Sequence, residues 1–164
     1  SIGINKAVDE ESLKEAVKIA FSHDSKVVIE EFIEGQELEV AVFGYDNPFA
    51  SYVGEIRPSA DFYDYDAKYV TGTSQLLIPA EIPEKASDTI RETAVAAYKA
   101  LCCKGLSRVD FFLTKEGEVL VNEINTLPGF TNISMYPKLQ EHMGLAYADL
   151  IDKLIGFAME RYDG

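Results

Sequence analysis

The stretch that most constrains this chain is segment 106–130, which reads LSRVDFFLTKEGEVLVNEINTLPGF. Apolar and polar residues alternate in its first half, and a second apolar run follows at 119–124, which predicts two β-strands. The intervening segment 115–118, Lys-Glu-Gly-Glu, contains turn residues and predicts that the two strands fold back on each other. We therefore expect an antiparallel hairpin around which the rest of the fold is organised.

The pairing of this hairpin predicts a cluster of polar side chains. If the turn is centred on Glu-Gly at the middle of the loop, Asp110 lies opposite Glu123 and Arg108 lies opposite Asn125. Opposed carboxylates repel each other and a buried unpaired charge is costly, so the pairing indicates a cation between the two acids. Two carboxylates and an amide oxygen form a ligand set that suits Mg²⁺. The alternative is a solvated face on which Arg108 alone neutralises the acids.

The rest of the chain predicts strands interleaved with helices. Helices are expected from Asp9 to residue 22, from Pro83 to Gly105, from Ser134 to Gly144 and over 146–161, and strands over 26–33, 37–45 and 49–57, with Gly35 as a turn between the first two strands. This order indicates an α+β fold with a largely antiparallel sheet and flanking helices.

Segment 59–74, SADFYDYDAKYVTGTS, has a different composition from the predicted strands and helices. Aromatic and acidic residues surround one lysine, Lys68, and there is no clear apolar face. Such a segment is typical of a mobile lid, in which the rings exclude water and the cation reaches a phosphate. The alternative is an irregular, well-packed surface loop.

Charge and cysteine usage narrow the classes of partner and compartment. The formal net charge of −13 argues against binding of nucleic acid or of an anionic membrane surface. The two cysteines, Cys102 and Cys103, are adjacent, which indicates reduced thiols in a cytoplasmic protein. No apolar run approaches the length of a membrane span. The chain begins at Ser1 without Met, which indicates either processing or a sequence that starts part-way through a longer protein.

Four segments resemble the ATP-grasp enzymes and, among these, the D-alanine–D-alanine ligases. They are EEFIEGQELEV at 30–40, FYDYDAKY at 62–69, GLSRVDFFL at 105–113 and NEINTLPGFTNIS at 122–134. They occur in the family's order and span most of the chain. The resemblance implies that residues 1–164 are the C-terminal, ATP- and metal-binding catalytic portion, with 59–74 as a lid loop and without the family's N-terminal substrate domain.

The resemblance also implies roles for individual residues. Asp110, Glu123 and Asn125 correspond to ligands of two Mg²⁺ or Mn²⁺ ions, with Glu123 shared by both. The residues that correspond to ATP-binding positions are Glu30, Phe32, Ile33, Glu37, Lys68 and Ser1. Those that correspond to catalytic positions are Arg108, the Gly129 amide and the lid residue Tyr69, and Ser134 corresponds to the residue that binds the second substrate's carboxylate.

The activity implied by the resemblance is an ADP-forming ligase that joins two D-alanines through an acylphosphate, for peptidoglycan precursors and hence cell-wall synthesis. A D-alanine–D-lactate ligase of the same fold is the first alternative, although Tyr69 favours an amine acceptor. A non-catalytic module that binds a nucleotide or a partner chain is the second. We expect the 164 residues alone to ligate little or no D-alanine, and the whole enzyme could be a homodimer.

Overall fold

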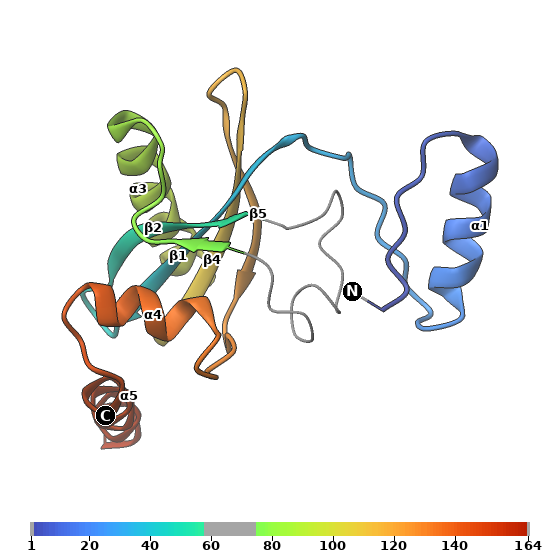
Figure 1. Ribbon diagram of the computed structural model, residues 1–164. Helices are drawn as coiled ribbons and strands as arrows, with labels where there is room; N and C mark the ends of the chain where they lie inside the picture. Colours follow the sequence, from blue (N-terminus) through green and yellow to red (C-terminus); the bar gives the residue numbers. More distant parts are fainter. Residues whose placement is uncertain (1, 58–74, 164) are drawn as a thin grey trace. The chain divides into compact units, whose positions relative to one another are not determined.

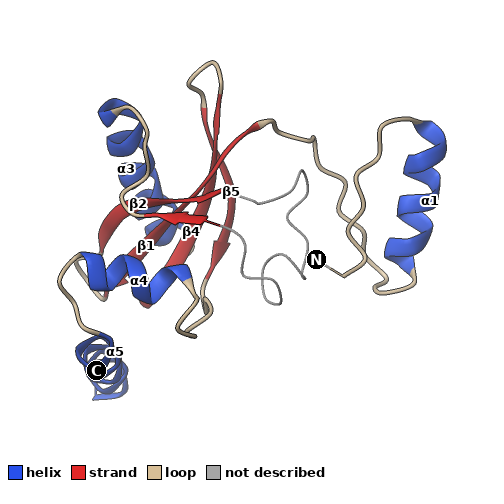
Figure 2. Cartoon of the chain, viewed as in Figure 1, coloured by secondary structure: helices blue, strands red, loops and turns tan. Residues whose placement is uncertain are grey.

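The computed structural model describes residues 2–57 and 75–163, which divide into two compact units. Residues 2–33 belong to the first unit, and residues 34–57 with 75–163 form the second (Figures 1 and 2). The elements are α1 (Glu10–Phe21), β1 (Gly35–Gly44), β2 (Phe49–Arg57), β3 (Gln75–Leu77), α3 (Glu84–Ala100), β4 (Gly105–Thr114), β5 (Val119–Asn125), α4 (Met135–His142) and α5 (Tyr147–Asp163). No helix within these ranges is long and apolar enough to cross a membrane.

Helix α1 of the first unit begins where the sequence predicts. The Ser12 N–H donates to the Asp9 carboxylate at 2.8 Å, and the Asp9 N–H donates to the Ser12 hydroxyl at 3.1 Å. This reciprocal pairing satisfies N–H groups that have no partner within the first helical turn. After α1, residues 26–34 have no regular secondary structure, so the strand that we expected over 26–33 is wrong.

Gly35 is the first residue of β1 and not a turn. A Cβ atom at this position would lie 2.5 Å from the carbonyl oxygen of Leu113 on β4, which leaves no room for a side chain. Glycine allows the two strand backbones to approach this closely. Its presence therefore marks a backbone contact and not the chain reversal that we expected.

The second unit is built on a five-stranded sheet in the order β3-β2-β1-β4-β5, in which all neighbours are antiparallel. Helix α3 packs on one face through Ile90 and Ala94, where Val53 of β2 joins the core. The next residue, Gly54, meets Met135 of α4, because successive strand residues face opposite sides. The two helices therefore cover opposite faces (Figure 1), and the prediction of an α+β fold with an antiparallel sheet is confirmed.

Strands β4 and β5 form the predicted hairpin, but its turn has three residues. The Thr114 N–H donates to the Glu118 carbonyl oxygen at 3.0 Å, and Gly117 adopts a φ of +84° inside this turn. Glycine is favoured at the last turn residue because it adopts a positive φ without a steric penalty. Next to the turn, the pairing is therefore displaced by one residue from the predicted register.

A bulge in β5 restores the predicted register beside the polar cluster. Phe111 pairs with Val121, whereas Asp110 pairs with Glu123, which leaves Asn122 as an extra residue. The extra residue reverses the alternation of side chains along β5. Val121 consequently shares a face with the core residue Phe111, while Glu123 shares the opposite face with Asp110. The predicted Asp110–Glu123 pair is confirmed, although two compensating shifts produce it.

Candidate functional site

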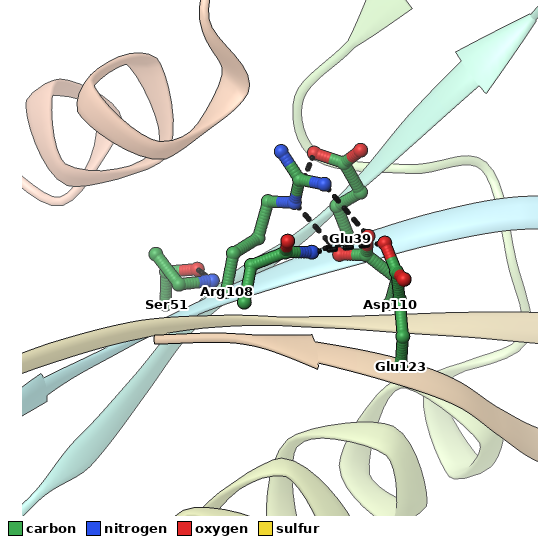
Figure 3. Close-up of polar contacts among 7 residues, drawn as sticks. Glu39, Ser51, Arg108, Asp110 and Glu123 are labelled. Carbon is green, nitrogen blue, oxygen red and sulfur yellow. Dashed lines mark hydrogen bonds and ion pairs between the residues drawn. The ribbon is translucent and has the colours of Figure 1, made fainter. Parts of the chain in front are cut away.

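The sheet face opposite α3 carries the polar residues predicted from the hairpin. Arg108 and Asp110 on β4 pair with Asn125 and Glu123 on β5. The Asn125 Nδ2 atom lies 3.2 Å from Asp110 Oδ2 and 3.0 Å from Glu123 Oε1. One amide therefore reaches both carboxylates, and Figure 3 shows Arg108, Asp110 and Glu123 of this cluster.

A fifth side chain of this cluster, Glu39 of β1, is not among the predicted site residues. Its Cα pairs with that of Asp110, and the residue is 5% exposed. Its Oε2 atom lies 3.1 Å from the Nε of Arg108. A signal was available in the sequence, because Leu38 and Val40 on either side belong to the α3 core, so alternation directs Glu39 to the opposite face.

The guanidinium of Arg108 connects these acids. Its Nε and Nη2 atoms donate to the two oxygens of Asp110, both at 2.7 Å, which is the bidentate geometry of a strong charge-assisted pair. Burial acts to lower the pKa of Arg108, but the hydrogen bond to Asp110 and the charges of Glu39, Asp110 and Glu123 outweigh burial and raise it. The side chain is 12% exposed and remains charged. Arg108 therefore neutralises Asp110, as in the alternative without a cation, but one guanidinium faces three carboxylates.

The oxygen donors of Asp110, Glu123 and Asn125 are of the kind that hard cations bind. In the described ranges, no three His, Cys, Asp or Glu side chains are arranged so that together they could hold a metal ion. The set expected from the hairpin contains two carboxylates and one amide, so it differs from such a group of three by its amide ligand.

The residues assigned to ATP lie in both units. Glu37 is on β1 of the second unit and is half-buried. Glu30, Phe32 and Ile33 belong to the segment without regular structure in the first unit, where Glu30 is exposed. Phe32 is 57% exposed, and the ammonium of Lys6 lies 3.5 Å from the centre of its ring. Three further predicted residues, Ser1, Lys68 and Tyr69, lie outside the described residues, as does the whole of the expected lid at 59–74.

Gly129 and Ser134 lie close together after β5. A Cβ atom on Gly129 would be 2.9 Å from the Ser134 Oγ. Ser134 occupies the predicted N-cap position of α4, but its side chain makes no capping hydrogen bond to the helix. Its Oγ instead accepts a hydrogen bond from the Thr131 N–H at 3.0 Å, which fixes the loop before the helix.

Comparison with known proteins identifies the relatives of this chain. A family model described as "D-ala D-ala ligase C-terminus" matches residues 1–156. The chain is 57% identical, over 164 residues, to a D-alanine–D-alanine ligase of Acetivibrio thermocellus, in an alignment that covers 99% of this chain and 44% of the relative. The chain therefore spans less than half the length of that relative.

Solved structures agree with the sequence match. The VanG D-Ala:D-Ser ligase from Enterococcus faecalis is similar with a TM-score of 0.83 and 44% identity, over 94% of this chain and 45% of that one. The D-alanine–D-alanine ligase from Bacillus anthracis, complexed with ATP, is similar with a TM-score of 0.79 and 32% identity, over 96% of this chain and 51% of that one. These neighbours support the ATP-grasp fold expected from the sequence. Because the family model also covers residues 1–156, this chain belongs to the D-ala D-ala ligase C-terminus family.

Proposed function

We propose that this chain is the nucleotide- and metal-binding part of an ATP-dependent ligase that joins two D-alanines in the cytoplasm, for peptidoglycan precursor synthesis. Family membership supports the ligase class, and the ATP complex of the Bacillus anthracis relative supports ATP as co-substrate. The observation that carries the proposal is the cluster of three carboxylates and one amide around Arg108. Its carboxylate and amide oxygens are ligands that suit a divalent cation.

Asp110, Glu123 and Asn125 would hold two Mg²⁺ or Mn²⁺ ions, with Glu123 shared between them. The fit is supported by the distances of 3.2 and 3.0 Å that connect the Asn125 amide with the two carboxylates. The oxygen and nitrogen of a side-chain amide can exchange places, so Asn125 can present its oxygen at the same position. When bound, the ions would offset the negative charge on the phosphoryl group during its transfer.

We propose ATP-binding roles for six residues. We assign adenine to Glu30 and the backbone of Phe32 and Ile33, the ribose hydroxyls to Glu37, and the phosphates to Lys68 and the Ser1 amide. Phe32 and Glu30 are exposed and Glu37 is half-buried, so a ligand can reach all three. A backbone amide and a lysine are suitable donors to phosphate oxygens.

The reaction would proceed in two steps. A carboxylate is a poor electrophile, so the γ-phosphoryl of ATP is first transferred to the carboxylate of one D-alanine, which gives an acylphosphate and ADP. The amine of the second D-alanine then attacks the acyl carbon, and phosphate leaves. Arg108 and the Gly129 N–H would donate to the oxygen on which charge grows, each worth about 3 to 4 kcal/mol in the transition state. Ser134 would bind the second carboxylate, and closure of Tyr69 with its lid would exclude water.

The release of ADP in the presence of D-alanine tests this function, in a protein of the relatives' full length. Glu123→Gln is expected to lower kcat at least tenfold, because it removes the charge of a metal ligand. Glu116→Gln provides the matched control, since Glu116 is exposed in the turn of the same hairpin and belongs to no proposed site. ADP release that needs no D-alanine, or that Glu123→Gln leaves unchanged, would contradict the proposal.

The second substrate is the point on which the family members differ. The Enterococcus faecalis neighbour is a D-Ala:D-Ser ligase, and D-lactate is the acceptor in the alternative raised from the sequence. We propose D-alanine, because Tyr69 corresponds to the residue typical of amine acceptors. Competition of D-alanine, D-serine and D-lactate for one pool of activated D-alanine decides the matter. A non-catalytic module would bind nucleotide with Mg²⁺ and form no ADP with any of them.

We further propose that these 164 residues alone ligate little or no D-alanine, since they cover 44% of the Acetivibrio thermocellus relative. Residues 1–164 would form one catalytic portion with 59–74 as its lid, and the whole enzyme would be a homodimer. Light scattering of the longer protein measures whether it is a homodimer. An assay of the isolated chain beside the longer protein measures whether the 164 residues alone ligate D-alanine. Equal rates for the two proteins would overturn the proposal that the isolated chain is nearly inactive.

A further inference from the structure

Glu39 occupies an unusual position for an acidic residue. It lies in the middle of β1, 5% exposed, and pairs with Asp110 on β4 and with Gly54 on β2. Two carboxylates thus face each other across neighbouring strands in a buried place, where like charges repel strongly. The guanidinium of Arg108 lies between them (Figure 3).

Arg108 divides its donors unequally between the two acids. Both of its contacts to Asp110 are 2.7 Å long, and its Nε also lies 3.1 Å from Glu39 Oε2. These contacts occupy both oxygens of Asp110. A cation that binds Asp110 must therefore bind an oxygen that already accepts a hydrogen bond from Arg108, and its charge repels the nearby guanidinium. If Asp110 were its sole partner, Arg108 would then lose much of its buried counter-charge, which is strongly destabilising.

We infer that Glu39 is a positioning residue that holds the Arg108 guanidinium in place when Asp110 turns to a divalent cation. The inference rests on the proposed function, since it concerns the metal and the donor named there. Glu39 keeps Arg108 neutralised and oriented toward the reacting acyl oxygen, and so lowers the competition between Arg108 and the cation for Asp110. Glu39 itself binds neither substrate nor metal.

The first test is a titration of the full chain with Mn²⁺ alone, followed by electron paramagnetic resonance. Glu39→Gln keeps the size of the side chain and removes its charge. Arg108 then keeps only one of its two buried carboxylate contacts, and we expect the Kd for Mn²⁺ to rise roughly tenfold, which corresponds to 1.4 kcal/mol. Glu55→Gln is the matched control, because Glu55 is 3% exposed and receives both Arg57 donors in the same bidentate way. Equal Mn²⁺ affinity in wild type and Glu39→Gln would overturn the inference.

The second test separates an action through Arg108 from a direct attraction between Glu39 and the cation. In an Arg108→Met background there is no guanidinium to hold, so Glu39→Gln should change the Kd for Mn²⁺ less than twofold. A further tenfold rise in that background would overturn the inference, because Glu39 would then act on the cation by its own charge.

The third test needs no metal. Asp110→Asn weakens the partner of Arg108 that forms the two shortest contacts. The NMR signal of the Arg108 Nε–H should remain protected from solvent exchange in this variant, and it should lose protection when Glu39→Gln is added. Loss of protection in Asp110→Asn alone would overturn the inference. If wild type binds no Mn²⁺, the proposed metal site fails, while this measurement still decides the role of Glu39.

Discussion

Two arginines of the sheet, Arg108 and Arg57, make the same local contact in different surroundings. Arg108 donates through Nε and Nη2 to Asp110, two residues away on β4, and Arg57 donates through the same two atoms to Glu55, two residues away on β2. The Arg57 side chain is 42% exposed, whereas that of Arg108 is 12% exposed.

The surroundings also differ in their charge balance. Arg57 has a second acid, Glu81, which is 72% exposed, and the buried Glu55 also accepts from the neutral amide of Gln36 at 3.1 Å. The Arg108 cluster has three carboxylates, of which Glu39 and Asp110 are buried. The same two-atom contact therefore serves a partly exposed group of acids in one place and a group of three acids, two of them buried, in the other. The second group is the one to which we assign the proposed cation.

The largest expected difference between the clusters is in stability. Arg108→Gln removes the guanidinium that contacts two buried carboxylates, and we expect the free energy of unfolding to fall by about 3 to 5 kcal/mol. Arg57→Gln should cost clearly less, because water and Gln36 remain as partners of Glu55. Urea denaturation of the two variants measures both losses. Equal losses would show that burial does not distinguish the two arginines.

Added Mg²⁺ should also change the urea midpoints of the same two variants by different amounts. In Arg108→Gln the three acids have no competing guanidinium, so saturating Mg²⁺ is expected to raise the urea midpoint by binding the folded state. In Arg57→Gln, Mg²⁺ should raise the urea midpoint by no more than it raises the midpoint of wild type. A larger gain in Arg57→Gln would contradict the assignment of the cation to the Arg108 cluster.

Glu123→Gln should affect binding and leave stability almost unchanged. Glu123 is exposed, so its replacement is expected to change the free energy of unfolding by less than about 0.5 kcal/mol. The Kd for Mn²⁺ should nevertheless rise at least tenfold, because a ligand charge is removed. Calorimetric titration of the variant beside Glu116→Gln measures the effect, and unchanged affinity would exclude Glu123 as a ligand.

The smallest expected effect is that of Glu81→Gln. The ion pair of Glu81 with Arg57 lies at the surface, where salt screens it and where such pairs contribute little. The urea midpoint should be the same as that of wild type at high salt and differ only slightly at low salt. A loss that persists at high salt would show that the Arg57 cluster is less exposed to water than its side chains indicate.

The sequence was informative where a local pattern determined the structure. The reciprocal bonds of Asp9 and Ser12 are encoded within four residues, and the hairpin turn is marked by Gly117. The pairing of Asp110 with Glu123 was also predicted, but from a two-residue turn without a bulge, whereas the structure reaches it through a three-residue turn and a bulge. The family was expected from a resemblance in four segments that occur in the family's order.

The parts that escaped prediction depend on contacts between distant segments. Glu39 joins the site because β1 lies beside β4, which no local pattern specifies. Gly35 resembled a turn because its actual partner, the Leu113 carbonyl, is far away in the sequence. The positions of Ser1, Lys68 and Tyr69 lie outside the described residues, so their assignments remain predictions.

The bulge at Asn122 makes the polar cluster depend on how β5 pairs with β4 as well as on the identity of its residues. If Asn122 took a regular place in the ladder, it would pair with Asp110, and Glu123 and Asn125 would project toward α3, into the apolar core. Removing Asn122 altogether would instead leave a regular ladder in which Val121 and Glu123 still pair with Phe111 and Asp110. The extra residue therefore cancels the one-residue displacement that the three-residue turn introduces, and the site depends on the two irregularities together.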